Sequence, residues 1–327
     1  MEVVSTSKPA KLAFLMRKAL TVKDLLTYEM YRVCGQSDLT WRYVANWKPW
    51  LAYQRTRKPL DAIQANVVAK LEREGIAITS VKDFFGDSLL FEELEIAVQK
   101  LEGDLSGEIR KAREGREHPN RVKSYLVKLL GTLPVLDPHD IFARLALHPR
   151  VLDVVNSYYG MFAKLRHYNV WHNIPSQDEA RESQLWHRDP EDRYILKMFI
   201  YLTDVDQGAG PLSYAPGTHA RGTVTANPQA HIVREGPNQR ETLRTDDNQM
   251  RTLVPEEKWL TARGPKGMVV FVDTRGYHKG GLVRERDRIA YMCTFTSKAS
   301  ILLEDMFERK LSAPTGADQA TVFAIGS

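Results

Sequence analysis

Cysteine is scarce in this sequence, and long hydrophobic runs are missing. The two cysteines among 327 residues cannot form a disulfide framework, so we expect a reducing, cytoplasmic environment. The longest clean apolar runs, such as residues 268–272, are far too short to span a bilayer. The first residues also lack the apolar core of a secretory signal. These features predict a protein with no membrane span.

Charge is not concentrated in a way that indicates nucleic-acid binding. The formal net charge is +5, which suits a small anionic molecule, but the basic residues are diffuse, and we find no zinc-finger or RNP-like pattern. Lys8, Lys11, Arg17 and Lys18 make the start of the chain basic. That stretch is compatible with a targeting segment or with a basic helix packed on the domain.

Several common catalytic motifs are missing as well. There is no G-x-x-x-x-G-K-[ST] phosphate loop and no G-x-S-x-G elbow. Gly-x-Gly occurs at 208–210, but Pro211 follows it, which is wrong for a dinucleotide-binding turn. These absences exclude the usual signatures of nucleotide binding and serine hydrolysis.

Two kinds of periodicity divide the chain. Up to residue 160, apolar residues recur at helical spacing, with helices predicted after Pro59, around 90–101, at 140–147 and at 149–159. Residues 102–124 are charge-dense and predict a loop or a solvated helix. Beyond residue 160 the period becomes two, with strands predicted at 163–171, 195–202, 211–215, 268–272 and 289–296.

This pattern favours one domain over residues 1–327. It would have a mainly helical part (1–160), a sandwich or barrel (161–300) and a C-terminal extension (301–327). The long polar stretch 217–258 is typical of a lid or binding loop.

The stretch LWHRDP at 185–190 indicates a metal site. His187 and Asp189 are two positions apart, so an extended backbone points both side chains to the same side. His278, just past the apolar run 268–272, supplies a third candidate ligand. Two histidines and one carboxylate form the facial triad of non-haem iron(II) oxygenases, which leaves positions for a co-substrate and O2. Arg288 opens the next strand and could clamp a remote carboxylate of 2-oxoglutarate.

The strand at 195–202 carries further candidates. Leu196, Met198, Ile200 and Leu202 form a wholly apolar face, which should meet a covering layer. Lys197, Phe199 and Tyr201 share the other face, which could line the barrel interior and bring a cation to 2-oxoglutarate or to an anionic substrate.

A tentative substrate pocket follows from the same alternation. Leu165 and His167 point with Asn169 and Trp171 along one predicted strand face, and Gln184 shares a predicted strand face with Trp186. The candidate pocket residues are His167, Trp171, Gln184, Phe199 and Tyr201.

Four segments in order resemble a known family. WHRDP, FIYLTDVDQGAGPLSYAPGTHARG, GMVVFVDTRGYHKGG and RIAYMCTF look like the phytanoyl-CoA dioxygenase (PhyH) family of Fe(II)/2-oxoglutarate oxygenases. The resemblance covers roughly residues 162–297. The acidic or amide residue often found before the Gly-Pro turn is replaced here by Gly208-Ala209, which affects a loop. Halogenases of the family lack the carboxylate ligand, so Asp189 disfavours halogenation.

The resemblance implies an α+β fold with a double-stranded β-helix (jelly-roll, cupin-like) core flanked by N-terminal helices. It implies iron bound by His187, Asp189 and His278, with Arg288 on the far carboxylate of 2-oxoglutarate. The expected reaction oxidises, by default hydroxylates, an unactivated C–H bond of a small-molecule or acyl substrate, forming succinate and CO2. Desaturation and ring closure remain open, as do the substrate and the oligomeric state. Two alternatives share the barrel: a cupin-like metal enzyme that does not use 2-oxoglutarate, and a catalytically silent binding protein.

Overall fold

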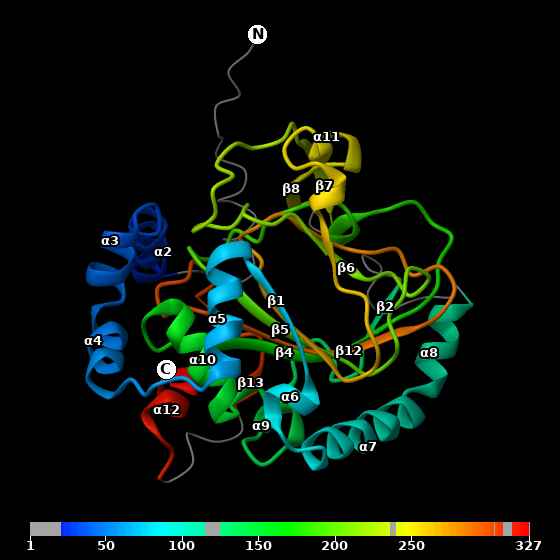
Figure 1. Ribbon diagram of the computed structural model, residues 1–327, viewed down its shortest axis with the longest axis horizontal. Helices are drawn as coiled ribbons and strands as arrows, with labels where there is room; N and C mark the ends of the chain where they lie inside the picture. The colour runs from blue at the N-terminus through cyan, green and yellow to red at the C-terminus, as the bar shows by residue number, and fades with distance from the viewer. Residues whose placement is uncertain (1–20, 115–124, 236–239, 304, 310–315, 327) are drawn as a thin grey trace.

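The computed structural model describes residues 21–114, 125–235, 240–303, 305–309 and 316–326 (Figure 1). Lys8, Lys11, Arg17 and Lys18 therefore lie outside the described residues. The helical elements of the first half are α2 (Val22–Cys34), α3 (Asp38–Thr40), the π-helical turn η1 (Trp41–Ala45), α4 (Trp47–Thr56), α5 (Ala62–Glu74), α6 (Val81–Phe85), α7 (Leu89–Asp104), α8 (Ser106–Arg113), α9 (Ile141–Ala146) and α10 (Pro149–Tyr159).

Local signals explain where these helices begin and end. Asp61 caps α5 by accepting hydrogen bonds from the backbone N–H groups of Ile63 and Gln64, and Gly75 ends it with a left-handed φ of 83°. Pro149 opens α10 as expected. The predicted helices are confirmed. The described part of the charge-dense stretch comprises the end of α7 and the solvated helix α8, which buries Ile109, and residues 115–124 lie outside the described ranges.

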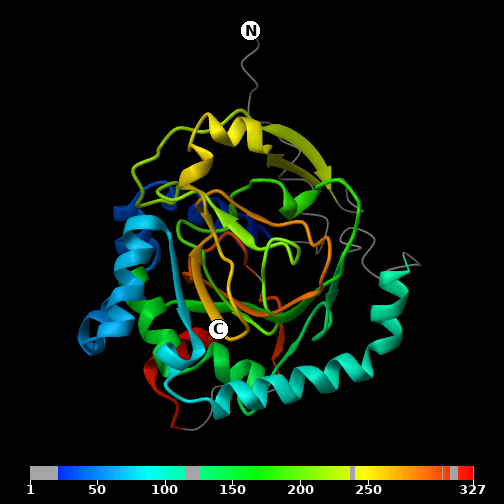
Figure 2. The same ribbon diagram turned by 45° about the vertical axis from the view of Figure 1, so that its right-hand side comes forward.

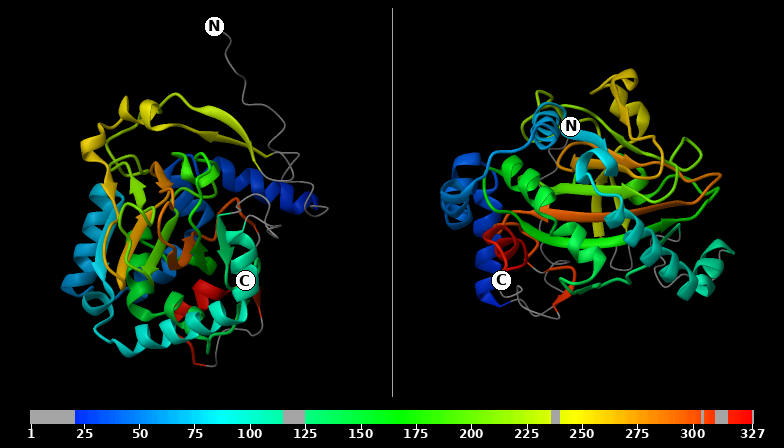
Figure 3. Two further views of the ribbon diagram at one scale, coloured as in Figure 1. Left: turned by 90° about the vertical axis from the view of Figure 1, so that its right-hand side faces the viewer. Right: turned by 60° about the horizontal axis from the view of Figure 1, so that its bottom comes forward.

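Most of the described strands form a six-stranded sheet and a three-stranded sheet, and two further pairs form two-stranded sheets. The six-stranded, larger sheet is ordered β1-β10-β5-β12-β4-β2 and the three-stranded, smaller sheet β11-β6-β9. Their bounds are β1 (Ile76–Ser80), β2 (Leu126–Lys128), β4 (Lys164–Asn173), β5 (Leu196–Tyr201), β6 (Leu212–Tyr214), β9 (Leu260–Thr261), β10 (Met268–Asp273), β11 (His278–Gly280) and β12 (Arg288–Thr296). Strands β4, β12 and β5 run side by side through the middle of the molecule (Figure 3, right). All five strand predictions are therefore confirmed within a few residues.

The two faces of β5 meet different cores, as the sequence predicts. Leu196, Met198 and Ile200 pack in the large core beneath the helices, whereas Tyr201 and Phe199 belong to the core between the two sheets. On the outer side of the larger sheet, α5 contacts β1 and β10, while α9 contacts β4. The side of the larger sheet that faces the smaller sheet is called the luminal face below.

Strand β4 departs from the predicted alternation at one point. The register pairs Thr294 with His167 but the next residue, Phe295, with Leu165, so a β-bulge falls at Arg166. Leu165 consequently packs in the large outer core. The expectation that Leu165 and His167 share a face is therefore wrong, because a bulge reverses the side on which the preceding residues point.

The polar stretch 217–258 contains regular structure. It forms the hairpin β7 (His231–Glu235) and β8 (Arg240–Arg244), the short helix α11 (Asp247–Arg251) and the turn η3 (Glu256–Lys258). The hairpin and α11 lie together at one end of the molecule, opposite α7, and arch over the strands (Figures 1 and 2).

Past β12 the described elements are β13 (Glu308–Arg309), which pairs with β3 (Val135–Leu136), and α12 (Gln319–Ile325). Helix α12 contacts α10 and β4, so this segment packs on the helical side of the molecule. Across the described ranges, no helix combines the length and the apolar character that crossing a bilayer requires.

Candidate metal centre

His187, Asp189 and His278 meet at one point of the structure. One ligand atom from each lies within 4.8 Å of the other two. Asp189 Oδ1 is 3.9 Å from His187 Nε2, and its Oδ2 is 3.9 Å from His278 Nε2. The two histidines are neighbours across an antiparallel bridge, with each backbone N–H donating to the other's carbonyl at 3.0 Å. The backbone itself therefore fixes the spacing of the two imidazoles.

Both imidazoles have their second nitrogen engaged by the backbone. His187 Nδ1 lies 2.8 Å from the carbonyl oxygen of Leu185, and His278 Nδ1 lies 3.0 Å from that of Gly276. A carbonyl only accepts, so Nδ1 carries the proton and the Nε2 lone pair faces the common point. Burial is the main cause that lowers the pKa of His278 to about 4 and that of His187 well below its usual value. Both rings are thus neutral at pH 7, as metal binding requires.

Asp189 is held in its ionised form by a lysine. Burial by itself would raise the pKa of Asp189, but the charge of Lys197, assisted by both histidines, outweighs it and holds that pKa well below its usual range. Lys197 Nζ donates to Asp189 Oδ2 at 2.6 Å. The donor set of two neutral imidazoles and one carboxylate fits a divalent metal ion bound on one face.

The turn that follows Asp189 is fastened to the end of β10. The Asp189 N–H donates to the carbonyl of Thr274 at 2.9 Å, and Arg275 donates from Nη1 to the carbonyl of Asp189 at 2.9 Å. The N–H of Thr274 in turn donates to the carbonyl of Ile195 at 2.8 Å. These bonds fix the turn against the segment that leads into His278.

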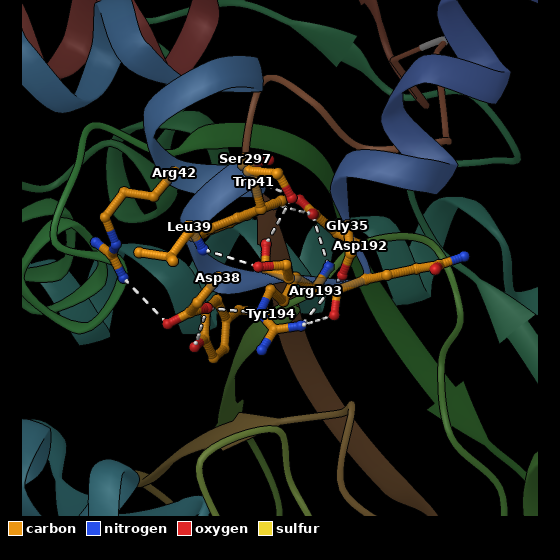
Figure 4. A network of polar contacts seen from close by, with 12 residues as sticks. Gly35, Asp38, Leu39, Trp41, Arg42, Asp192, Arg193, Tyr194 and Ser297 are labelled. Atoms are coloured by element: carbon orange, nitrogen blue, oxygen red, sulfur yellow. Dashed lines mark hydrogen bonds and ion pairs between the residues drawn. The ribbon is translucent and has the colours of Figure 1, made fainter.

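A polar network ties the same turn to the N-terminal helices (Figure 4). The buried carboxylate of Asp192 accepts from Trp41 Nε1 at 2.7 Å and from the Ser297 N–H at 2.6 Å. Asp38 accepts from Arg193 Nε at 2.5 Å and from the Tyr194 hydroxyl at 2.8 Å. Hydrogen bonds from the N-terminal helical segments therefore stabilise the turn that follows Asp189.

Arg288 lies beside the triad at the start of β12. A Cβ placed on Gly280, two residues after His278, would lie 3.9 Å from Arg288 Nη2. Burial lowers the pKa of Arg288, and the nearby Tyr201 and Tyr125 oppose that shift. Within the described part of the chain, its guanidinium has no hydrogen bond or ion pair. A guanidinium can form two parallel hydrogen bonds with a carboxylate.

The profile of the phytanoyl-CoA dioxygenase (PhyH) family matches residues 78–288. The chain belongs to the phytanoyl-CoA dioxygenase family. The predicted membership of a family of Fe(II)/2-oxoglutarate-dependent oxygenases is therefore confirmed.

Solved structures resemble this PhyH-family chain at low sequence identity. EctD from S. alaskensis with bound Fe is 16% identical with a TM-score of 0.51, and the match covers 77% of this chain and 83% of EctD. AviO1 from Streptomyces viridochromogenes Tue57 is 18% identical with a TM-score of 0.46, covering 74% of this chain and 98% of AviO1. The likeness to EctD confirms the α+β jelly-roll fold. A search among curated proteins finds no match.

Most of the expected pocket residues of the PhyH-family chain share the luminal face. The register places Phe199 opposite Met292 and Tyr201 opposite Ala290, with Trp171 on the far side of Ala290. The rings of Trp171 and Phe199 meet edge to face, with centroids 6.1 Å apart. Tyr201 donates to the carbonyl of Ala262 at 3.0 Å and so ties the larger sheet to the segment after β9.

Two other pocket candidates have local partners. His167 is on the same face, with Nδ1 3.3 Å from the carbonyl of Met306, and burial is the main cause that lowers its pKa to about 4. Gln184 ends the 3₁₀ turn η2 (Glu182–Gln184), and its Oε1 accepts from the Arg181 N–H at 3.2 Å. The expectation that Gln184 lies on a strand is wrong, because the chain is still turning there.

Sequence reasoning missed two cations near the site. Lys128 on β2 lies opposite Trp171 in the register, and burial lowers the pKa of Lys128. Strand β2 has three residues, too few to show a period. Arg244 ends β8 in the polar stretch 217–258, where nothing in the sequence marks one arginine among several.

Proposed function

We propose that this PhyH-family enzyme uses Fe(II), 2-oxoglutarate and O2 to hydroxylate an unactivated C–H bond of a small-molecule or acyl substrate. One oxygen atom of O2 would enter the substrate and the other would enter succinate, with release of CO2. The convergence of His187, Asp189 and His278 beside the unpaired guanidinium of Arg288 carries this proposal. One oxygenase domain over residues 1–327 is part of it.

The protein's own residues would bind and orient. Iron would be held by His187 Nε2, His278 Nε2 and an oxygen of Asp189, and it would supply the oxidising chemistry when bound. Arg288 would pair with the far carboxylate of 2-oxoglutarate. Its guanidinium lies next to Gly280, and Gly280 belongs to β11, the strand that begins with the ligand His278.

Lys197 would act at the same centre. One of its three N–H donors is used by Asp189, which leaves two for bound 2-oxoglutarate or an anionic substrate. We therefore propose that Lys197 both holds the carboxylate ligand in place and contacts the co-substrate.

The substrate would occupy the luminal face next to the triad. Trp171 and Phe199 offer an aromatic wall, and Tyr201 continues it toward Arg288. His167 and Gln184 complete the proposed pocket from β4 and from η2. Such a lining suits an organic molecule with an apolar part, while the neighbouring cations favour an acidic one.

An anaerobic titration tests the proposal. Fe(II) and then 2-oxoglutarate are added to the protein, and the visible metal-to-ligand charge-transfer band is recorded. The band should form in the wild type, disappear in His187→Ala and weaken in Arg288→Ala. Arg286→Ala is the matched control, because Arg286 is exposed and pairs with Asp206.

The other outcomes of this titration identify the alternatives. Iron binding without a band would indicate a cupin-like metal enzyme that does not use 2-oxoglutarate. No iron binding at all would indicate a silent binding protein on the same fold. With a band established, succinate release in a substrate screen, followed by mass analysis of the product, would separate hydroxylation from desaturation or ring closure.

A further inference from the structure

Arg244, the last residue of β8, lies next to the segment that carries His187. Directly after β8, Thr245 pairs with Trp186, and each N–H donates to the other's carbonyl at 3.0 Å. Neighbours of such a pair lie opposite one another on the other face of the two strands. Arg244 therefore lies across from His187 and on the same side as its imidazole, while Trp186 points away into the outer cluster with Trp259.

The base of the hairpin is fixed to both ligand-bearing segments. Asp247, three residues after Arg244, accepts from Trp186 Nε1 at 2.7 Å and pairs with the ammonium of Lys279. Trp186 precedes His187, and Lys279 follows His278. The Thr245 hydroxyl also donates to the carbonyl of Gln229 at 2.6 Å. The backbone at Arg244 is thus held at a set position relative to the segments that carry the two imidazoles.

The electrostatics of the ligands agree with this placement. After burial, which is the largest cause, the charge of Arg244 contributes to the lowered pKa of both His187 and His278. The side chain of Arg244 is partly exposed, so a molecule that enters over the triad can reach it.

The charges around the site also favour an acidic substrate. Fe(II) and doubly charged 2-oxoglutarate would add no net charge. Asp189 offsets Lys197, which leaves the positive charges of Arg288 and the partly buried Lys128. Lys128 has no ion pair within the described part of the chain. An oxyanion on the substrate would balance this excess.

We propose that Arg244 binds an oxyanion, a carboxylate or a phosphate, on the primary substrate and so positions that substrate beside the metal centre. The planar guanidinium can grip such a group through two parallel hydrogen bonds. The proposal rests on the oxygenase function proposed above. It makes the β7–β8 hairpin a specificity element.

The test uses simple probes on the full chain loaded anaerobically with Fe(II) and saturating 2-oxoglutarate. Inorganic phosphate, butyrate and uncharged butyramide are titrated while the change in the charge-transfer band is followed. Phosphate or butyrate should perturb the band and butyramide should not, and which of the two binds more tightly distinguishes phosphate from carboxylate. In Arg244→Gln the anion should bind about tenfold more weakly or worse, and Arg244→Lys should recover part of the affinity. Arg286→Gln should bind as the wild type does.

A second readout separates this proposal from the proposed function. Calorimetric titration of phosphate and butyrate into the metal-free chain, repeated in the Arg288→Ala background so that the co-substrate arginine cannot bind the anion, should show the same dependence on Arg244, whether or not a charge-transfer band ever forms. Equal affinity in the wild type and Arg244→Gln would overturn the proposal, as would the absence of anion binding to either. Loss of anion binding in Arg288→Ala alone would place the anion at the co-substrate arginine and also overturn it. Circular dichroism of each variant confirms that it is folded.

Discussion

Lys197 Nζ lies 2.6 Å from Asp189 Oδ2, so the carboxylate of the candidate triad is paired with a cation from the adjoining strand. The lysine removes the main penalty of burying an ionised carboxylate next to two neutral imidazoles. It also fixes which way the carboxylate turns.

Replacing Lys197 should make metal binding more sensitive to acid. In Lys197→Met, burial still raises the pKa of Asp189, but the opposing charge is gone, so the carboxylate takes up a proton at higher pH. The pH at which half of the Fe(II) binding is lost should therefore move upward, as measured by metal titration across a pH series. An unchanged midpoint would show that Lys197 does not control the charge of Asp189. Lys266→Met, at an exposed lysine paired with Glu95, is the control.

The network behind the ligand turn should contribute to stability. In Trp41→Phe the buried carboxylate of Asp192 loses one of its donors, at 2.7 Å, and a hydrogen bond to a charged group contributes about 1.5–3 kcal/mol. The free energy of unfolding in urea should fall by that amount. Trp47→Phe at the half-exposed Trp47 should change it by less than about 0.5 kcal/mol. Equal losses in the two variants would contradict the assigned role of Trp41.

The contact of His172 with Asp287, next to Arg288, should make the free energy of unfolding depend on pH. Burial by itself would lower the pKa of His172, but its Nε2 lies 2.6 Å from Asp287 Oδ2, and that bond together with Glu102 raises the pKa above its usual value. The protonated ring therefore stabilises the fold below the unfolded-state pKa of about 6.5, and this stabilisation is lost as pH rises through the folded pKa.

His172→Gln should accordingly destabilise the protein more at pH 6 than at pH 8, by about 1 kcal/mol. Urea unfolding at the two pH values measures this difference, with His139→Gln at an exposed position as the control. A penalty that is the same at both values would show that the protonated form of His172 contributes nothing.

Gly276 should not tolerate a side chain. A Cβ there would lie 1.9 Å from the Tyr214 hydroxyl oxygen, and the carbonyl of Gly276 is the partner of His278 Nδ1. Gly276→Ala should cost about 1–3 kcal/mol of stability and weaken metal binding, because the backbone that orients His278 must shift. Gly103→Ala in α7, where nothing lies within 4 Å of a Cβ, should stabilise by about 0.5–1 kcal/mol. Unchanged metal affinity in Gly276→Ala would show that the backbone at Gly276 does not control the orientation of His278.

The sequence predicts the luminal and outer faces of β5 because alternation survives wherever a strand is regular. The same reasoning fails at Arg166, where a single bulged residue reverses the side on which Leu165 points. It also fails at Gln184, where a 3₁₀ turn imitates the start of a strand. Both errors occur where the hydrogen-bond ladder is irregular, and periodicity carries no information about such places.

The candidate ligands could be predicted from the sequence because residue types that bind metals occur there at a spacing that suits metal binding. The two-residue spacing of His187 and Asp189 indicates a pair of ligands on one side of the backbone, and His278 follows a clear apolar strand. Arg244 and Lys128 could not be found this way, since their relevance comes from pairing between distant segments. Thr245, next to Arg244, pairs with Trp186, and Lys128 pairs with Trp171. Only the folded chain brings those charges to the site.

The bond between Trp41 and Asp192 has a consequence for where this enzyme can be divided. The family profile spans 78–288, yet Trp41 lies before that stretch and Ser297, another donor to Asp192, lies after it. A fragment cut at the limits of the family resemblance would lose these two donors, together with the first two residues of β1 and nearly all of β12. The segment that matches the family profile is therefore shorter than the segment of chain needed to keep the metal-ligand turn in position.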